Sequence, residues 1–189
     1  MNEEGDRSTE ILQKKLSILM KLRRYRIVSE EQKSEDLKDI YVLEHKTSKK
    51  LLIRLVTQSK LSSGSIGVKR VRDLKKTLEK SDVNGLLVGD SFTFSAKREA
   101  RRNNIELISG TELPAFNIFE HNLVPKHEIL AKEDVEEMLT KFRIKPWQLP
   151  WIKASDPAAR IIGAKPGDVL KIIRKSPTAG RAVAYRYVV

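Results

Sequence analysis

The side chains that most often perform catalysis or bind metals are sparse in this chain. Among 189 residues there are three histidines and no cysteine, which excludes disulfides, thiol catalysis and zinc-thiolate sites. His121 and His127 have no cysteine nearby and no converging set of carboxylates, so we predict no metal site there. The surroundings of Asp156 and Asp168 are typical of a helix cap and a turn rather than of catalytic acids.

The last nineteen residues, KIIRKSPTAGRAVAYRYVV, concentrate positive charge instead. Two segments of alternating apolar residues flank a turn at 176–180, which predicts a β-hairpin. Its cations either bind a nucleic acid or form the solvent-facing side of an element that docks on a protein, and the pattern alone leaves both open. These cations are Lys171, Arg174, Lys175, Arg181 and Arg186.

The overall composition favours an intracellular protein that meets polyanions. The formal net charge of +12 attracts polyanions at long range, although charged residues of both signs, which make up 33% of the chain, are also typical of an ordinary solvated surface. No apolar run approaches the roughly 20 residues of a membrane span, so we expect no membrane partner. The polar start MNEEGDRSTE is unlike a signal peptide, and we expect a cytoplasmic location.

The elements of the first half alternate between helices and strands. We predict a helix capped by Thr9 that runs to about Tyr25, with a stripe of Ile11, Leu12, Leu16, Leu19 and Met20. Strands are predicted at 40–43, 51–56, 85–89 and 105–108, with helices over 68–78 and 91–104. This order indicates an α/β layered domain.

The pattern changes after Pro114. An extended stretch at 123–130 is interrupted by Pro125, and a helix is predicted over 133–142 with Val135, Met138, Leu139 and Phe142 turned inward. A short helix begins at the cap Asp156 and ends at a glycine, followed by a turn at 165–168 and the terminal hairpin. The glycines at 163, 167 and 180 mark turns and form no phosphate-binding loop.

Three segments of this second half resemble, in order, the conserved module of the H-type subunit of archaeal RNA polymerase. They are HNLVPKHEIL (121–130), LPWIKASDPAARIIGAKPGDVLKIIRKSPTAG (149–180) and the terminal AVAYRYVV. The same module ends the fifth subunit shared by eukaryotic nuclear RNA polymerases. The sequence of the present chain resembles the archaeal form more closely than the eukaryotic one.

The resemblance implies a mixed sheet with helices on one side that docks on the largest polymerase subunit and aids assembly. It implies no chemistry of the module's own and no cofactor. The residues that match the pattern of this family include scaffold and contact positions, which the sequence does not separate. They are His121, Leu123, Val124, Pro125, Lys126, His127, Leu149, Pro150, Asp156, Pro157, Gly163, Gly167, Asp168, Ile172, Arg174, Ser176, Thr178, Gly180, Tyr185 and Arg186.

A second resemblance lies in the first half. Residues 65–113 are similar to the latter part of Mrr-type restriction endonuclease domains. The shared features are Val68 and Leu74 on a helix, GLLVG at 85–89, Phe92 with Thr93, the alanines 96 and 100, and IELISG. The resemblance implies a restriction-endonuclease-like α/β fold, and such an extension departs from the usual archaeal form of the polymerase subunit, which consists of the C-terminal module alone.

Mrr-type nucleases hold a divalent metal through an acid on one strand and a Glu or Gln, any residue, Lys triplet on the next. Alignment of YVLEHKTSKKLLIRLV with that pattern puts Tyr41 at the acid, Arg54 at the Glu or Gln, and Val56 at the lysine. Rival triplets at 58–60 and 44–46 lack a suitable loop or fall in a predicted turn. We therefore expect neither a metal nor catalysis.

A nuclease-like fold without its metal can still hold double-stranded DNA, because phosphate contacts need only cations and amides in the right place. The helices of this half carry the cations for a weak, sequence-independent contact with downstream DNA, although they are also compatible with an ordinary solvated surface. The candidates are Lys69, Arg70, Arg72, Lys75, Lys76, Lys97, Arg98, Arg101 and Arg102.

The sequence thus predicts two domains, an α/β restriction-endonuclease-like domain at 1–115 and a small α+β domain with a mixed sheet at 116–189. We expect a non-catalytic subunit of DNA-directed RNA polymerase, with the polymerase core and double-stranded DNA as partners. Two alternatives stay open: a metal-dependent DNA nuclease tethered to polymerase, and a free-standing DNA-binding regulator.

Overall fold

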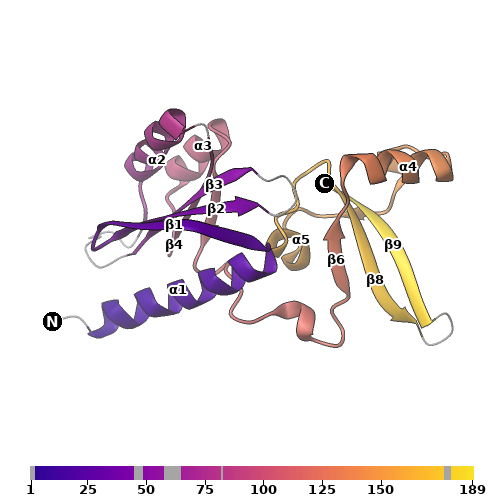
Figure 1. Cartoon of the computed structure of the whole chain (residues 1–189), viewed down its shortest axis with the longest axis horizontal. Helices are drawn as coiled ribbons and strands as arrows, with labels where there is room; N and C mark the ends of the chain where they lie inside the picture. The colour runs from indigo at the N-terminus through magenta and orange to yellow at the C-terminus, as the bar shows by residue number, and fades with distance from the viewer. Residues whose placement is uncertain (1–2, 45–48, 58–64, 82, 177–179) are drawn as a thin grey trace. The chain divides into compact units, whose positions relative to one another are not determined.

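The computed structural model describes residues 3–44, 49–57, 65–81, 83–176 and 180–189. The chain divides into two compact units, Met1–Phe116 and Asn117–Val189. Figure 1 shows the elements of each unit along the chain. Each unit has its own sheet and its own buried clusters.

The N-terminal unit is built on a five-stranded sheet in the order β1-β2-β3-β4-β5. The first three strands pair antiparallel and the last three pair parallel, so the sheet is mixed. Its elements are α1 (Glu3–Leu22), β1 (Tyr25–Ser34), β2 (Leu37–Glu44), β3 (Lys50–Val56), α2 (Val68–Ser81), β4 (Asn84–Gly89), α3 (Phe94–Arg102) and β5 (Glu106–Ser109).

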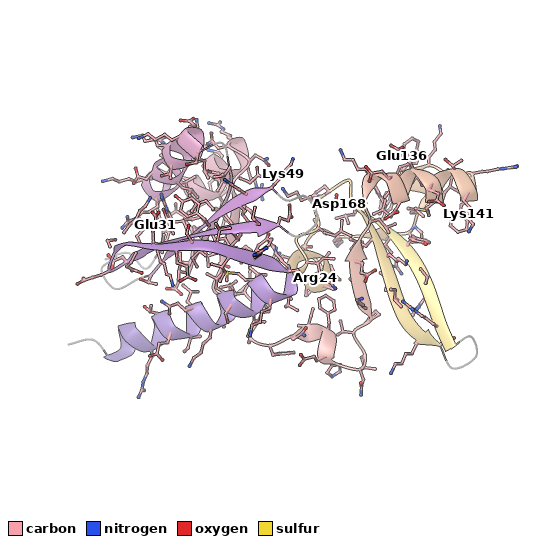
Figure 2. All side chains as sticks on the ribbon, in the orientation of Figure 1. Arg24, Glu31, Lys49, Glu136, Lys141 and Asp168 are labelled. Carbon is pink, nitrogen blue, oxygen red and sulfur yellow. The ribbon has the colours of Figure 1, made fainter. Side chains whose placement is uncertain are left out.

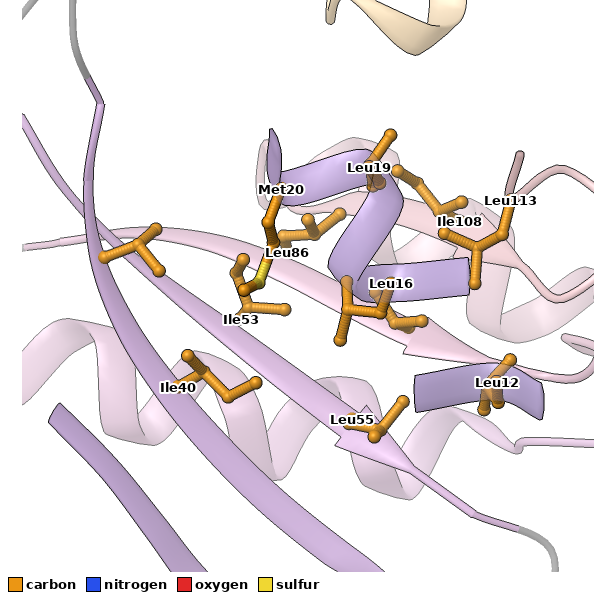
Figure 3. Close-up of a cluster of buried hydrophobic side chains, with 12 residues drawn as sticks. Leu12, Leu16, Leu19, Met20, Ile40, Ile53, Leu55, Leu86, Ile108 and Leu113 are labelled. Atoms are coloured by element: carbon orange, nitrogen blue, oxygen red, sulfur yellow. The ribbon is translucent and has the colours of Figure 1, made fainter. Parts of the chain in front are cut away.

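Helices cover both faces of this sheet, with α1 on one side and α2 and α3 on the other (Figure 1). Strand alternation explains the two layers: Ile53 and Leu55 of β3 join the cluster under α1, whereas Leu52 and Val56 join the cluster under α2 and α3. The α1 stripe packs onto Ile53, Leu86 and Ile108 (Figure 3). The α/β fold class predicted from the sequence is confirmed.

The first predicted helix is wrong at both ends. Helix α1 starts at Glu3 rather than at a Thr9 cap, and it stops at Leu22, where Arg24 adopts a left-handed conformation with φ of 55°. Tyr25 therefore opens β1, a strand that the sequence pattern does not predict. Ile11, assigned to the inward stripe, is 53% exposed, while the other four stripe residues are buried.

The C-terminal unit has a four-stranded mixed sheet in the order β6-β8-β9-β7. Strand β8 pairs antiparallel with β6 and β9, and β7 pairs parallel with β9. The single-turn helices η1 (Ile118–Glu120) and η2 (Pro146–Gln148) precede β6 and β7. The other elements are β6 (Lys126–Ile129), α4 (Lys132–Phe142), β7 (Trp151–Ile152), α5 (Pro157–Ile161), β8 (Val169–Ser176) and β9 (Gly180–Val188).

Helices α4 and α5 of this unit pack on opposite faces of its sheet, not on one side. Val169 lies in the cluster with Met138 of α4, while the next residue, Leu170, lies in the cluster with Ala159 of α5. The mixed sheet is confirmed. One inward assignment is wrong, because Phe142 at the end of α4 is 53% exposed, although its ring lies 6.2 Å from that of Tyr185.

The terminal hairpin is confirmed as β8 and β9. Its strands pair Lys171 with Tyr185 and, at the outer end, Lys175 directly with Arg181. Like charges in directly opposite positions destabilise a strand pair. The hairpin therefore ends in an electrostatically unfavourable pair of cations.

Candidate nucleic-acid interface and docking surface

A buried ion pair joins β2 and β3 of the N-terminal unit. Asp39 of β2 and Arg54 of β3 are directly opposite in the antiparallel register, with side chains 0% and 4% exposed. Arg54 Nε and Nη2 donate to the two carboxylate oxygens at 2.6 and 2.7 Å, and Lys33 Nζ lies 2.7 Å from the second oxygen. Arg54 Nη2 also donates to the Thr77 hydroxyl of α2 at 3.2 Å, so the cluster ties β1, β2, β3 and α2 together.

This register differs from the one predicted for the metal motif. Tyr41, aligned with the acid, lies opposite Leu52, and the acid opposite Arg54 is Asp39. The predicted alignment misses Asp39 because it begins at the apolar run YVL, two residues too late. The available signal is strand alternation, which puts Asp39 and Tyr41 on the same face of β2.

The residues of this cluster do not fit a divalent metal. Both oxygens of Asp39 already accept charge-assisted hydrogen bonds, and a guanidinium occupies the position across from it. Burial alone would raise the pKa of Asp39, but the hydrogen bonds from Arg54 and Lys33 outweigh it and lower the pKa. Among the described residues no group of three or more His, Cys, Asp or Glu could hold a metal. The rival triplets involve residues 45–46 and 58–60, which lie outside the described residues.

We therefore expect Mg²⁺ or Mn²⁺ to leave the thermal stability of the full chain unchanged. A bound metal would stabilise the folded state in proportion to its occupancy. Differential scanning calorimetry with either metal, against a matched EDTA sample, measures this. A saturable rise in Tm that the Asp39→Asn variant loses would contradict this expectation.

Two further polar contacts fix α1 over the sheet. Arg23 donates to the two oxygens of Glu106 on β5 at 3.0 and 2.7 Å, and Lys15 Nζ donates to the Gly110 carbonyl at 3.0 Å. Burial alone would lower the pKa of Arg23, but the Glu106 carboxylate outweighs it and raises the pKa. Burial also raises the pKa of Asp90, against the opposing charge of Lys15. These contacts join helix and sheet and thus serve the fold.

The predicted DNA-binding cations lie on the outer surface of α2 and α3. Nitrogen-tipped side chains project from these helices away from the sheet (Figure 2). Arg70 and Lys75 are partly buried, and two ion pairs engage members of the set: Arg72 with Glu99 at 3.5 Å and Lys75 with Glu79 at 3.6 Å. The members that the structure exposes are Lys69, Arg72, Lys76, Lys97, Arg98, Arg101 and Arg102.

The α3 cations lie on a helix of nine residues. Thr93 caps the helix by accepting from the Ala96 amide, and Ala96 and Ala100 face the sheet. The opposite face presents Arg98, Arg101 and Arg102 at i, i+3 and i+4, which are neighbours on a helix surface. We call these three residues the α3 basic face.

Many of the predicted family-motif residues of the C-terminal unit are scaffold. Leu149 and Ile172 are buried, and Tyr185 packs against the α4 cluster. Asp156 accepts from the amides of Ala158 and Ala159 at 2.9 and 3.3 Å and so caps α5. Asp168 closes a turn by accepting from the Lys165 amide at 2.7 Å.

The glycines and prolines of the motif shape the chain. Gly163, Gly167 and Gly180 have φ of 79°, 98° and 65°, where a Cβ would cause strain. Pro157 occupies the first turn of α5, and the Pro125 carbonyl lies 2.7 Å from His127 Nδ1. Ser176 and Gly180 pair at the end of the hairpin, and Thr178 lies outside the described residues.

Four exposed motif residues lie at or near the start of β6, whereas Pro150, Pro157, Gly167 and Gly180 are exposed elsewhere in the unit. Leu123 is 84% exposed and precedes β6, whose first residue, Lys126, pairs with Ile173 beside the exposed Arg174. His121 is exposed as well and accepts from the Leu123 amide through Nδ1 at 3.2 Å. We call His121, Leu123, Lys126 and Arg174 the β6 surface. Val124 beside it is half-buried, while Pro150 is exposed next to β7 and Arg186 contacts the Trp151 carbonyl.

No helix in the described part of the chain is long and apolar enough to cross a membrane.

Comparison with known proteins separates the two units. The family described as "Restriction endonuclease" matches residues 10–116, and the family described as "RNA polymerase Rpb5, C-terminal domain" matches residues 116–188. A solved chain from the structure of EndoMS in apo form is 16% identical, covers 58% of this chain and 47% of its own, and has a TM-score of 0.41.

The second unit has relatives of high identity. A DNA-directed RNA polymerase subunit Rpo5 from Staphylothermus marinus is 63% identical over 73 residues, which are 39% of this chain and 80% of that protein. The subunit of the same name from Thermococcus onnurineus is 65% identical over 74 residues, which are 39% of this chain and 90% of that protein. These relatives contain little beyond the matched module.

Proposed function

Because the chain belongs to the Rpb5/Rpo5 family of RNA polymerase subunits through its C-terminal unit and to the restriction endonuclease family through its N-terminal unit, we propose that it is a non-catalytic subunit of DNA-directed RNA polymerase. The observation that carries this proposal is the match over 80 to 90% of the length of the two Rpo5 relatives. In this proposal residues 116–189 form the assembly domain and residues 1–115 form a jaw that contacts downstream DNA. A cytoplasmic location belongs to the same proposal.

The β6 surface supports the docking part of the proposal. Leu123 is the most exposed of the large apolar residues of this unit. Lys126, whose Nζ lies 2.7 Å from Glu128 Oε1, and Arg174, the neighbour of the strand partner of Lys126, lie at the same end of β6 and add polar groups on the two faces of the sheet. An apolar residue within a polar rim is the common anatomy of a protein interface. We therefore assign this surface to the contact with the largest polymerase subunit.

The α3 basic face supports the DNA part. Phosphate contacts require exposed cations and no metal, and the Asp39–Arg54 pair leaves no fit for the nuclease metal. The unit would then retain a nuclease-like fold for duplex binding without cleavage. Metal-dependent cleavage by the purified chain is the outcome that the nuclease alternative requires.

We expect the chain, tagged and expressed in its native cells, to co-purify with the polymerase core in a stoichiometric amount. Reversing the β6 surface with Leu123→Asp and Arg174→Glu should lower recovery of the core roughly tenfold or more, since hot-spot losses reach about 2 kcal/mol each. Lys141→Glu, an exposed cation on α4 (Figure 2), is the matched control.

Absence of the unmodified chain from the core would overturn the subunit assignment and favour the free-standing regulator. Normal recovery of the Leu123→Asp, Arg174→Glu variant would leave the chain a subunit but remove the β6 surface from the contact. The variant with residues 1–113 removed should still co-purify if assembly belongs to the C-terminal unit.

A further inference from the structure

Two tryptophans of the C-terminal unit lie on its surface. Trp147 of η2 is 60% exposed and Trp151 of β7 is 63% exposed, and neither belongs to the buried clusters of the unit. Large aromatic side chains are among the most costly to leave in water, so an exposed pair points to a ligand or partner. Neither tryptophan is one of the family-motif residues predicted from the sequence.

The backbone around the two rings is fixed. Leu149 between them is buried, and the amides of Tyr187 and Val189 donate to the carbonyls of Pro150 and Ile152 at 3.0 and 2.9 Å. The Lys145 amide donates to Gln148 Oε1 at 2.7 Å and so closes η2. The rings are therefore presented by ordered backbone.

Positive charge surrounds the rings. Lys145 Nζ lies 5.2 Å from the centroid of the Trp147 ring, and Arg186 Nη1 donates to the Trp151 carbonyl at 3.2 Å. A hollow of about 390 Å³ beside Trp151 is lined by Ile152, Lys153, Ser155, Asp156 and Arg186. The carboxylate of Asp156 is already engaged as the cap of α5. We call Lys145, Trp147, Trp151, Lys153 and Arg186 the tryptophan patch.

We propose that the tryptophan patch binds single-stranded nucleic acid, with bases stacked on the two indole rings and phosphates near the three cations. Aromatic rings interleaved with cations are the means by which proteins hold single strands without reading their sequence. The indole N–H of Trp151 already donates to the Trp147 carbonyl at 3.3 Å, so this ring offers a partner its π face rather than a hydrogen bond. A ring that offers only its π face favours a stacked base over a hydrogen-bonding peptide. The competing occupant of the tryptophan patch is an acidic protein segment.

The chain provides its own probe for this proposal, because Trp147 and Trp151 are its two tryptophans. We expect an oligothymidylate of about 15 nucleotides to quench the intrinsic fluorescence of the full chain in a saturable, salt-sensitive way. The variants Trp147→Leu and Trp151→Leu each leave one reporter and should bind roughly tenfold more weakly. Phe142→Leu, which removes an exposed aromatic residue outside the patch, should bind normally.

One control separates the patch from the N-terminal unit, and a second tests the competing occupant. The variant Arg98→Glu, Arg102→Glu removes cations of the α3 basic face and should keep the quenching. Polyglutamate in place of the oligonucleotide tests the acidic peptide: a blue shift with polyglutamate and no quenching with oligothymidylate would assign the patch to a protein partner. Unchanged fluorescence with both ligands would also overturn the proposal. Thermal unfolding of each tryptophan variant confirms that it is folded.

Discussion

Replacing Arg54 with methionine is expected to lower the free energy of unfolding of the N-terminal unit by about 3 to 5 kcal/mol. The substitution leaves the Asp39 carboxylate in a site where its side chain is 0% exposed, with Lys33 still beside it. A carboxylate that loses a bidentate guanidinium in the interior keeps its desolvation cost and loses most of the compensating attraction. Urea unfolding followed by circular dichroism measures the change.

The double variant Asp39→Leu, Arg54→Met tests whether the destabilisation by Arg54→Met comes from the unpaired Asp39 charge or from the loss of the Arg54 side chain itself. Removing both charges should recover part of the stability lost in the single variant, because no uncompensated charge then remains buried. Arg72→Met is the matched control, since Arg72 is largely exposed and pairs with Glu99 at 3.5 Å. It should cost about 1 kcal/mol or less. An Arg54→Met variant as stable as this control would contradict the role of the pair.

The same cluster also gives stability a dependence on pH. Hydrogen bonds from Arg54 and Lys33 lower the pKa of folded Asp39 below its ordinary value of 3.8, against the opposing effect of burial. The folded state therefore gains stability from this carboxylate at pH values above about 4, and loses it as pH falls through the lowered pKa. Below about pH 4 the Asp39→Asn variant should show a shallower loss of stability than the unmodified chain.

Reversing the charge of the α3 basic face should produce the largest change in DNA binding. The variant Arg98→Glu, Arg101→Glu, Arg102→Glu removes three phosphate contacts, if this face is the one that holds duplex DNA. The slope of log K against log salt should then become shallower by about 2.7, and affinity near 0.1 M salt should fall roughly 100-fold or more. Fluorescence anisotropy with labelled duplexes over a range of salt concentrations measures both quantities.

A control with the same change in net charge tests whether the location matters. The residues Lys132, Lys141 and Lys165 are exposed in the C-terminal unit, outside the tryptophan patch and the β6 surface. Their change to Glu should weaken DNA binding much less, because distant charges act only through a screened field. Equal losses in the two triple variants would show that binding depends on overall charge and not on the α3 basic face.

Elements are most predictable from the sequence where one side of a segment is buried. The helix α2 follows that rule, since its apolar residues recur at the helical period. The strands β3 and β4 are buried on both faces and are predictable instead as short continuous apolar runs. Strand β1 escapes prediction because nine of its ten residues are exposed, so it carries no alternating pattern. Its pairing partner β2, rather than its own sequence, makes it a strand.

The interactions at the candidate sites are likewise predictable from the sequence only where they are local in the chain. Caps and turns such as Asp156 and Asp168 are predictable, because their hydrogen bonds join residues two or three positions apart. The pair of Asp39 with Arg54 spans fifteen positions and depends on strand register, which the apolar pattern does not determine. Exposed tryptophans cannot be told from buried ones, since the sequence around them has no clear period.

The directly opposed Lys175 and Arg181 give the hairpin an unusual response to its ionic surroundings. Dissolved salt screens their repulsion and so favours the pairing of β8 with β9. The same salt would weaken binding of DNA by α3. If α3 binds DNA as proposed, the two units respond to ionic strength with opposite signs. An acidic partner at this end would neutralise both cations at once and so would favour the pairing of β8 with β9.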